Sequence, residues 1–209
     1  MKPAVVILAA GASARLGECK ALASLGGKSA LEHLIEQSSM AGAKEILVVS
    51  GAHHELIEGE LRRIPCGSSA RLVLNPRWAE GRSGSVAAAV AQLEGRDLLL
   101  APIDVPLVGA AVFRILFEAW SAAGSPPGGW LAPALEPGPR HGHPVVLGAE
   151  LAAEAAKLNP GCPLRELRQR ARPLWGVSVL DPAILDDLDC PEDLARLRFR
   201  MAKGRGPPG

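Results

Sequence analysis

The chain has 209 residues, a hydrophobic fraction of 48% and nearly balanced charge, with 23 Lys and Arg against 22 Asp and Glu. This length suits one α/β domain with a well-buried core, and the composition is that of an ordinary soluble globular protein. A net charge of +1 argues against the broad basic surfaces that bind nucleic acid or an anionic membrane. Any affinity for phosphate must therefore come from a local site.

The cysteines and the hydropathy pattern bear on the compartment. The four cysteines are far apart and show no CxxC spacing, so neither a structural zinc site nor a disulfide framework is expected. No apolar run approaches the roughly 20 residues of a membrane span. The apolar start of the chain leads directly into a glycine motif, which indicates a first strand and not a signal peptide. We therefore expect a cytoplasmic protein.

Short apolar runs alternate with amphipathic helical stretches along most of the chain. This pattern indicates βα units around a mainly parallel sheet flanked by helices. Strands are predicted over residues 4–9, 45–50, 71–74, 97–103, 130–135, 145–147 and 175–180. The continuous apolar character of the first four indicates burial on both faces. Helices are predicted over residues 29–41, 53–63, 85–93, 110–122, 150–158, 164–171 and 191–202.

The domain organisation is simple. We predict a single domain over residues 1–202, because the chain has no internal repeat and no linker long enough to join two domains. The last predicted helix begins at Pro191, followed by two acidic residues, and both features suit a helix N-terminus. Residues 203–209 are predicted to be a disordered tail.

The strongest chemical signal follows the first predicted strand. Residues 8–20 read LAAGASARLGECK. Small residues let the backbone approach a ligand, and successive N–H groups can surround phosphate oxygens. Arg15 and Lys20 add a planar guanidinium and a point charge, both suited to a polyphosphate. The alternative is a glycine turn with two solvated cations, because a lone glycine motif is a weak signal.

Two familiar phosphate-binding motifs do not match this chain. The dinucleotide fingerprint G-x-G-x-x-G lacks its middle glycine, since Ser13 follows Gly11 at that spacing. The P-loop pattern finds its end at residues 27–29, but Leu22 stands where its first glycine belongs. The glycine motif is therefore of another kind.

Acidic residues supply the second and third signals. Asp104 follows the predicted strand 97–103, at the end where open α/β sheets bind ligands, so its carboxylate is a candidate Mg²⁺ ligand. A helix N-cap or a loop acid is the alternative. Further acids lie between residues 187 and 193. Asp187 or Asp189 can complete a metal site if the chain folds back, whereas the others only charge the start of the last helix.

Two basic clusters have simpler interpretations. His141 and His143 lie two residues apart, but no cysteine or third histidine is near them in the sequence, which argues against zinc. Four arginines lie between residues 165 and 172. A solvated face is the first interpretation of this run, and contact with an anionic small molecule is the second.

Taken together, the motifs resemble those of the molybdenum cofactor nucleotidyltransferases, and the cytidylyltransferase branch in particular. Residues 8–20 are similar to the family's LAAGxSxRMGxxK signature, and residues 75–86 to its NPxWxxGxxxSV segment. The family's DMP or DQP, GHPV and DIDTPED motifs resemble residues 104–106, 142–145 and 187–193. The motifs occur in the family's order and span nearly the whole chain.

The resemblance implies a Rossmann-like nucleotidyltransferase fold and Mg²⁺-dependent transfer of CMP from CTP to the phosphate of molybdopterin, with release of pyrophosphate. It implies catalytic roles for Lys20, Arg15 and Asp104, and Mg²⁺ ligation by Asp104 and Asp189. It implies acceptor contacts from Gly142 and His143. The nucleotide-binding residues that it implies are Leu8, Ala9, Ala10, Gly11, Ala12, Asn75, Gly81 and Ser85.

The chain departs from the family pattern at several positions. Leu16 replaces the usual methionine, and Cys190 replaces the usual threonine before the last helix, where it weakens the expected cap. The guanylyltransferase branch carries LAGG and GPLAG segments, whereas Ala10 and residues 81–85 of this chain side with the cytidylyl branch.

Three interpretations of function remain open. The first is CMP transfer to molybdopterin. The second is a related nucleotidyltransferase that acts on a sugar phosphate or another cofactor precursor, or that uses GTP. The third is a non-catalytic nucleotide-binding chaperone that serves a client molybdoenzyme. The presence of Arg15, Lys20 and Asp104 favours catalysis over binding alone.

Overall fold

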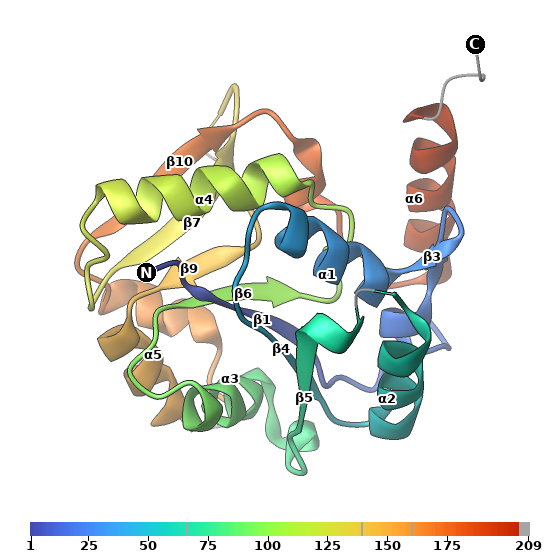
Figure 1. The fold of residues 1–209 in the computed structure, drawn as a ribbon, viewed down its shortest axis with the longest axis horizontal. Coiled ribbons are helices and arrows are strands. Elements are labelled where there is room, and N and C mark those ends of the chain that lie inside the picture. The colour runs from blue at the N-terminus through green and yellow to red at the C-terminus, as the bar shows by residue number, and fades with distance from the viewer. Residues whose placement is uncertain (66, 139, 160, 205–209) are drawn as a thin grey trace.

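The computed structural model describes residues 1–65, 67–138, 140–159 and 161–204. A mostly parallel, eight-stranded sheet lies at its centre, with helices on both faces (Figure 1). The strands follow the order β10-β7-β9-β6-β1-β4-β5, and β8 pairs with β7. This architecture confirms the predicted fold class. No helix in the described part of the chain has the length and apolar character that crossing a bilayer requires.

All seven predicted strands are present. Their observed bounds agree with the prediction to within one residue: β1 (Ala4–Ala9), β4 (Ile46–Ser50), β5 (Ala70–Leu74), β6 (Leu98–Pro102), β7 (Trp130–Leu135), β9 (Val145–Leu147) and β10 (Leu174–Val179). Three two-residue strands were not predicted: β2 (Ser24–Leu25), β3 (Lys28–Ser29) and β8 (Arg140–His141).

The helices agree with the prediction in position and, with one exception, in type. The α-helices are α1 (Ala30–Met40), α2 (His54–Arg63), α3 (Arg82–Gln92), α4 (Ala110–Ala122), α5 (Ala149–Ala156) and α6 (Pro191–Gly204). The helix expected over residues 164–171 is instead a 3₁₀ helix, η4 (Leu164–Gln169). Helix α6 extends two residues beyond its predicted end, and residues 205–209 of the predicted tail lie outside the described residues.

Strand β5 corrects one prediction about burial. None of its residues is fully buried, and Leu74 is 45% exposed, so the expectation that this strand is buried on both faces is wrong. The reason is its place in the sheet. Strand β5 is the outermost strand, where the covering layers end, whereas β1, β4 and β6 lie inside the sheet and are almost fully buried.

The alternating side chains of β1 enter two hydrophobic cores on opposite faces of the sheet. Val5 and Ile7 belong to the core that contains residues of α1, α2, α4 and α6. Ala4 and Val6 belong to the core that contains residues of α3, α5 and η4. Because β1 pairs in parallel with β4 and β6, the loops after these strands emerge at the same edge of the sheet. This edge is where a ligand of an open α/β sheet binds.

Candidate active site

A cleft of about 670 Å³ opens at the carboxyl ends of β1 and β6. It is lined by residues from the glycine loop, the start of α3, the loop after β6, residues 141–145 and residues 161–168. The structure therefore brings together segments from almost the whole length of the chain. The residues predicted for the site that line this cleft are Leu8, Ala10, Gly11, Lys20, Gly81, Ser85, Asp104, Gly142 and His143.

Three predicted nucleotide contacts are absent from the cleft lining. Ala9 is buried in the core beneath the loop. Ala12 is exposed, and its carbonyl oxygen lies 3.0 Å from His53 Nε2. Asn75 is buried, and its Nδ2 donates to Ser85 Oγ at 3.1 Å. Asn75 therefore supports the start of α3, and Ser85 is the member of this pair that reaches the cleft.

The glycine loop is held in shape by its own side chains. Ser13 adopts a φ of +54°, in the left-handed region, and its Oγ accepts a hydrogen bond from the backbone N–H of Lys20 at 3.1 Å. Leu16, the departure from the family's methionine, is buried in the core below. An apolar side chain at this position anchors the loop, so the replacement is mild. Lys20 then begins a short 3₁₀ helix, η1 (Lys20–Leu22), at the wall of the cleft.

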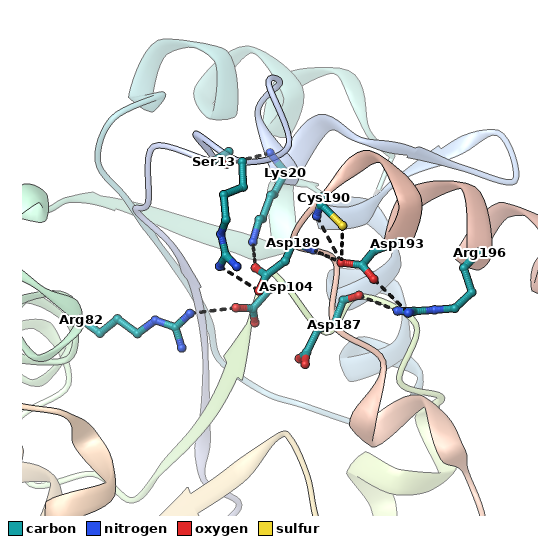
Figure 2. Close-up of polar contacts among 10 residues, drawn as sticks. Ser13, Lys20, Arg82, Asp104, Asp187, Asp189, Cys190, Asp193 and Arg196 are labelled. Atoms are coloured by element: carbon teal, nitrogen blue, oxygen red, sulfur yellow. Dashed lines mark hydrogen bonds and ion pairs between the residues drawn. The ribbon is translucent and has the colours of Figure 1, made fainter.

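Asp189 forms ion pairs with both cations of the glycine loop. Lys20 Nζ lies 2.5 Å from Asp189 Oδ1 (Figure 2). Arg15 Nη2 lies 2.9 Å from Asp189 Oδ2. The hydrogen bond from Lys20, together with the charges of Lys20 and Arg15, holds the pKa of the Asp189 carboxyl below its ordinary value. The Lys20 side chain is 13% exposed, whereas that of Arg15 is 74% exposed. Of the two cations that pair with Asp189, Lys20 is therefore largely buried and Arg15 is largely exposed to solvent.

The start of α6 fixes Asp189 in place. Asp193 Oδ2 accepts hydrogen bonds from the backbone N–H groups of Asp189 at 3.0 Å and Cys190 at 3.2 Å. A carboxylate three residues into a helix that reaches back in this way is half of a capping box. Asp193 thereby caps the helix where the family's threonine is replaced by Cys190. The backbone N–H of Leu188 donates to the Asp104 carbonyl at 2.7 Å, which ties the two acidic segments together.

Asp104 faces the same cleft from the loop after β6. Its Oδ2 accepts a hydrogen bond from Arg82 Nη2 at 2.9 Å, and its side chain is 14% exposed (Figure 2). Arg82 was not predicted from the sequence. It directly follows Gly81 in the NPxWxxGxxxSV segment, at a position that the pattern leaves unspecified. Helix α3 begins at Arg82, three residues before its predicted start at residue 85, so the only signal available was a cation beside a glycine shortly before a predicted helix.

Two further ionisable groups border this carboxylate. Partial burial and the charges of Asp104 and Asp189 raise the pKa of the Asp187 carboxyl, although the residue as a whole is exposed. Burial lowers the pKa of His143, and its Nδ1 is buried without a hydrogen-bond partner among the described residues. An unpaired buried nitrogen carries a desolvation cost, so a partner supplied by a ligand would be favourable.

The acidic residues suit a metal that is bound together with a nucleotide. Within residues 1–65, 67–138, 140–159 and 161–204, no three His, Cys, Asp or Glu side chains are grouped closely enough to hold a metal by themselves. Mg²⁺ at a nucleotide site takes one or two carboxylates, and phosphate oxygens and water complete its coordination. Asp104 with Asp187 or Asp189 is a donor set of this kind. The carboxylate of Asp189 already pairs with two cations, whereas no ion pair of Asp187 is found among the described residues.

The sequence and the fold are similar to those of known proteins. The chain is 30% identical over 207 residues to nicotine blue oxidoreductase from Paenarthrobacter nicotinovorans, a match that covers 92% of this chain and 94% of that protein. It is 25% identical over 198 residues to molybdenum cofactor cytidylyltransferase from Escherichia coli, with 95% and 96% covered.

A solved nucleotidyl transferase from Methanothermobacter has the same fold, with a TM-score of 0.79 and 24% identity over 98% of this chain and 99% of that one. Residues 5–174 match the family of MobA-like NTP transferase domains, and this stretch contains the glycine loop, Arg82, Asp104 and the 141–145 segment. The chain therefore belongs to the MobA-like NTP transferase domain family.

Proposed function

We propose that this protein transfers CMP from CTP to the phosphate of molybdopterin, with Mg²⁺ as cofactor and release of pyrophosphate. One observation carries the proposal: Lys20 of the glycine loop and Asp104 after β6 line the same cleft, at the carboxyl ends of two paired strands. A cation and a metal-binding carboxylate at this edge match the needs of a triphosphate.

The proposed reaction requires alignment of the acceptor phosphate with CTP and neutralisation of the phosphate charge, but it does not require a general base. The second pKa of a phosphate monoester is near 6, so the acceptor phosphate is mostly ionised at neutral pH and can attack the α-phosphorus of CTP directly. Lys20 Nζ donates to the phosphate oxygens that leave as pyrophosphate, and Arg15 adds a second donor. Both cations release Asp189 when they turn to the phosphates.

The carboxylates complete the site. Asp104 and Asp189 would hold Mg²⁺ once their cationic partners have turned away, with Asp187 as the competing candidate for the second position. The ion would supply charge neutralisation and alignment of the phosphate groups. Arg82, which now pairs with Asp104, is released for contact with an anionic ligand in the same cleft.

The nucleotide and the acceptor occupy different ends of the cleft in this proposal. The backbone at Leu8, Ala10 and Gly11, together with Gly81 and Ser85, forms the nucleotide end. Gly142 and His143 face the acceptor. The choice of CTP over GTP is supported by Ala10 and residues 81–85, which side with the cytidylyl branch. We place the reaction in the cytoplasm, in keeping with the free thiols of Cys19, Cys162 and Cys190.

The test is pyrophosphate release by the purified protein with CTP, GTP or ATP and Mg²⁺, each with and without molybdopterin. We expect release that requires both CTP and molybdopterin. Asp104→Asn should lower the rate by about 10²-fold or more, whereas the matched control Glu55→Gln, an exposed acid on α2, should leave it unchanged. Equal release with GTP refutes the nucleotide choice, and release only with a sugar phosphate refutes the acceptor. Tight CTP binding without release from any acceptor favours a cofactor chaperone that serves a molybdoenzyme.

A redox reaction in the same cleft is a second candidate. The observation that favours it is the full-length relationship to nicotine blue oxidoreductase. It predicts that the protein consumes an electron donor in the presence of an oxidised dye and releases no pyrophosphate from any NTP. Pyrophosphate release that depends on Asp104, without any consumption of an electron donor, rules this candidate out.

A further inference from the structure

The 3₁₀ helix η4 forms one wall of the cleft, and it is firmly attached to the core. Leu167 is fully buried in the same hydrophobic core as Val86 of α3, and Leu164 packs against that core. Ser83 Oγ at the start of α3 donates a hydrogen bond to the carbonyl of Cys162 at 2.6 Å. The loop before η4 and the helix itself are therefore held against α3, so the backbone that carries the cleft-facing side chains of η4 is fixed in position.

The helix type determines which side chains reach the cleft. A 3₁₀ helix has three residues per turn, so side chains three residues apart lie one above the other. Leu167 is buried in the core, and Leu164 packs against that core and also lines the cleft. Arg165 and Arg168, one position further along, stack as a second pair. Both of these arginines line the cleft. In the α-helix expected from the sequence, this alignment would be only approximate.

Among the described residues, the two cleft arginines have no counter-ion. In the described part of the chain, no hydrogen bond or ion pair involves the side chain of Arg165 or Arg168. The neighbouring acids are occupied elsewhere: Glu166 accepts a hydrogen bond from Cys162 Sγ at 2.8 Å, and Glu154 pairs with Arg170 at 3.4 Å. Two guanidinium groups on one face repel each other, and an anion placed between them would relieve this repulsion.

The other half of the basic run behaves differently. Arg170 pairs with Glu154, and Arg172 donates to the backbone carbonyls of Gln169 and Ala171. Neither Arg170 nor Arg172 lines the cleft. The four arginines therefore divide into two structural arginines and two that face the ligand cleft without partners.

We propose that Arg165 and Arg168 form a second anion-binding subsite, which binds an anionic group of the acceptor remote from the phosphate that attacks CTP. This inference rests on the proposed function and adds a requirement to it, namely that the acceptor carries at least two separate anionic groups. The cleft lining also includes the apolar side chains of Leu100, Trp130 and Val145. We therefore expect the acceptor to carry an uncharged part in addition to its anionic groups. Planar guanidinium groups bind carboxylate, phosphate and similar oxyanions through paired N–H donors.

The first test compares two double variants in the pyrophosphate assay with CTP and molybdopterin. Arg165→Ala/Arg168→Ala should raise the KM for molybdopterin about tenfold or more, because charge-assisted hydrogen bonds to the acceptor are lost. The KM for CTP should stay within about twofold of the wild-type value. The matched control, Arg170→Ala/Arg172→Ala, should leave both values unchanged. An unchanged KM for molybdopterin in the first variant, or an equal rise in the control, overturns the proposal.

The second test does not depend on turnover, so it separates failure of the subsite from failure of the proposed function. Inorganic phosphate is titrated into the wild-type protein, and the Nε–Hε NMR signals of Arg165 and Arg168, assigned from the single variants, are followed. We expect both signals to shift and saturate, and to do so equally in Lys20→Ala, which lacks the cation at the nucleotide end. If wild-type protein releases no pyrophosphate but these signals respond, the subsite stands and the proposed reaction falls. Signals that do not move, or that move only when Lys20 is present, overturn the subsite.

Discussion

Lys20→Ala is the most direct test of how the glycine loop acts. Lys20 Nζ is the best-buried cation of the loop and lies 2.5 Å from Asp189 Oδ1. In the proposed reaction it moves from this carboxylate to the departing phosphates. Removal of a single preorganised donor of this kind typically costs about 10²–10³-fold in turnover, or about 2.7–4 kcal/mol of transition-state stabilisation. We therefore expect the rate of pyrophosphate release to fall by about 10²-fold or more.

The same substitution should have little effect on folding. Asp189 is 29% exposed and keeps Arg15 as a partner at 2.9 Å, and ion pairs with this degree of solvent access contribute about 0–1 kcal/mol to the free energy of unfolding. In a chain of this length, 1 kcal/mol corresponds to a change in Tm of about 2–4 °C. A large loss of activity with a small loss of Tm separates the chemical role of Lys20 from a structural one.

The assay measures initial rates of pyrophosphate release at saturating CTP, Mg²⁺ and molybdopterin. Lys44→Ala, at an exposed lysine outside the cleft, is the matched control and should behave as wild type. Comparison of the double variant Lys20→Ala/Asp189→Asn with Asp189→Asn alone distinguishes the two uses of Lys20. If Lys20 only neutralises Asp189, the double variant is no slower than Asp189→Asn. Either that equality or a near-normal rate in Lys20→Ala alone would refute a direct action on the phosphates.

Two predictions concern stability. Gly142→Ala should lower Tm by several degrees, because the added Cβ would lie 2.2 Å from the backbone carbonyl oxygen of Ile184. Overpacking of this kind costs about 1–3 kcal/mol of unfolding free energy. The control in the same thermal melts is Gly59→Ala on α2, where an added Cβ would have no atom within 4 Å. Arg63→Ala should lower Tm at pH 7, because hydrogen bonds from Arg63 to the buried Glu60 hold the pKa of that carboxyl below its ordinary value. The stabilisation from ionised Glu60 is present above the ordinary pKa of a glutamate and is lost as the pH falls through the lowered pKa of Glu60. The difference in Tm between the wild type and Arg63→Ala should therefore shrink on acidification. A Tm difference that is constant with pH would contradict this account.

Strands β1, β4 and β6 could be predicted because burial on both faces leaves a continuous apolar run in the sequence. The same apolar run does not indicate whether a strand lies parallel or antiparallel to its neighbours. Strand β9 has the apolar signature of its neighbours and yet lies antiparallel to both β6 and β7. Strands of two residues, such as β8, are too short to show any periodicity, and their pairing comes from tertiary contacts alone.

The site was predictable where its residues follow buried strands. Lys20 lies in the loop after β1 and Asp104 in the loop after β6, and the sheet places both loops at one edge. Arg82, Arg165 and Arg168 offered no such signal, because the side on which a surface arginine lies depends on helix register and helix type. The single change from α-helix to 3₁₀ helix at η4 aligns two members of the basic run over the cleft, and no local pattern in the sequence reports it.

The pairing of charges in the cleft explains how a protein of net charge +1 can bind a triphosphate. Each cation of the nucleotide end already has a carboxylate: Lys20 and Arg15 pair with Asp189, and Arg82 pairs with Asp104. A triphosphate that bound alone would draw the cations away and leave the carboxylates unpaired. A divalent cation that bound alone would occupy the carboxylates and leave the cations unpaired. When both ligands bind, the cations pair with the phosphates and the carboxylates with the metal ion, so no charge is left without a partner. Binding of CTP and Mg²⁺ should therefore be strongly coupled, and by linkage each raises the affinity for the other by the same factor. Calorimetric titration of CTP with and without Mg²⁺, repeated in Asp104→Asn, measures this factor, and equal CTP affinity in both conditions would contradict the exchange of partners.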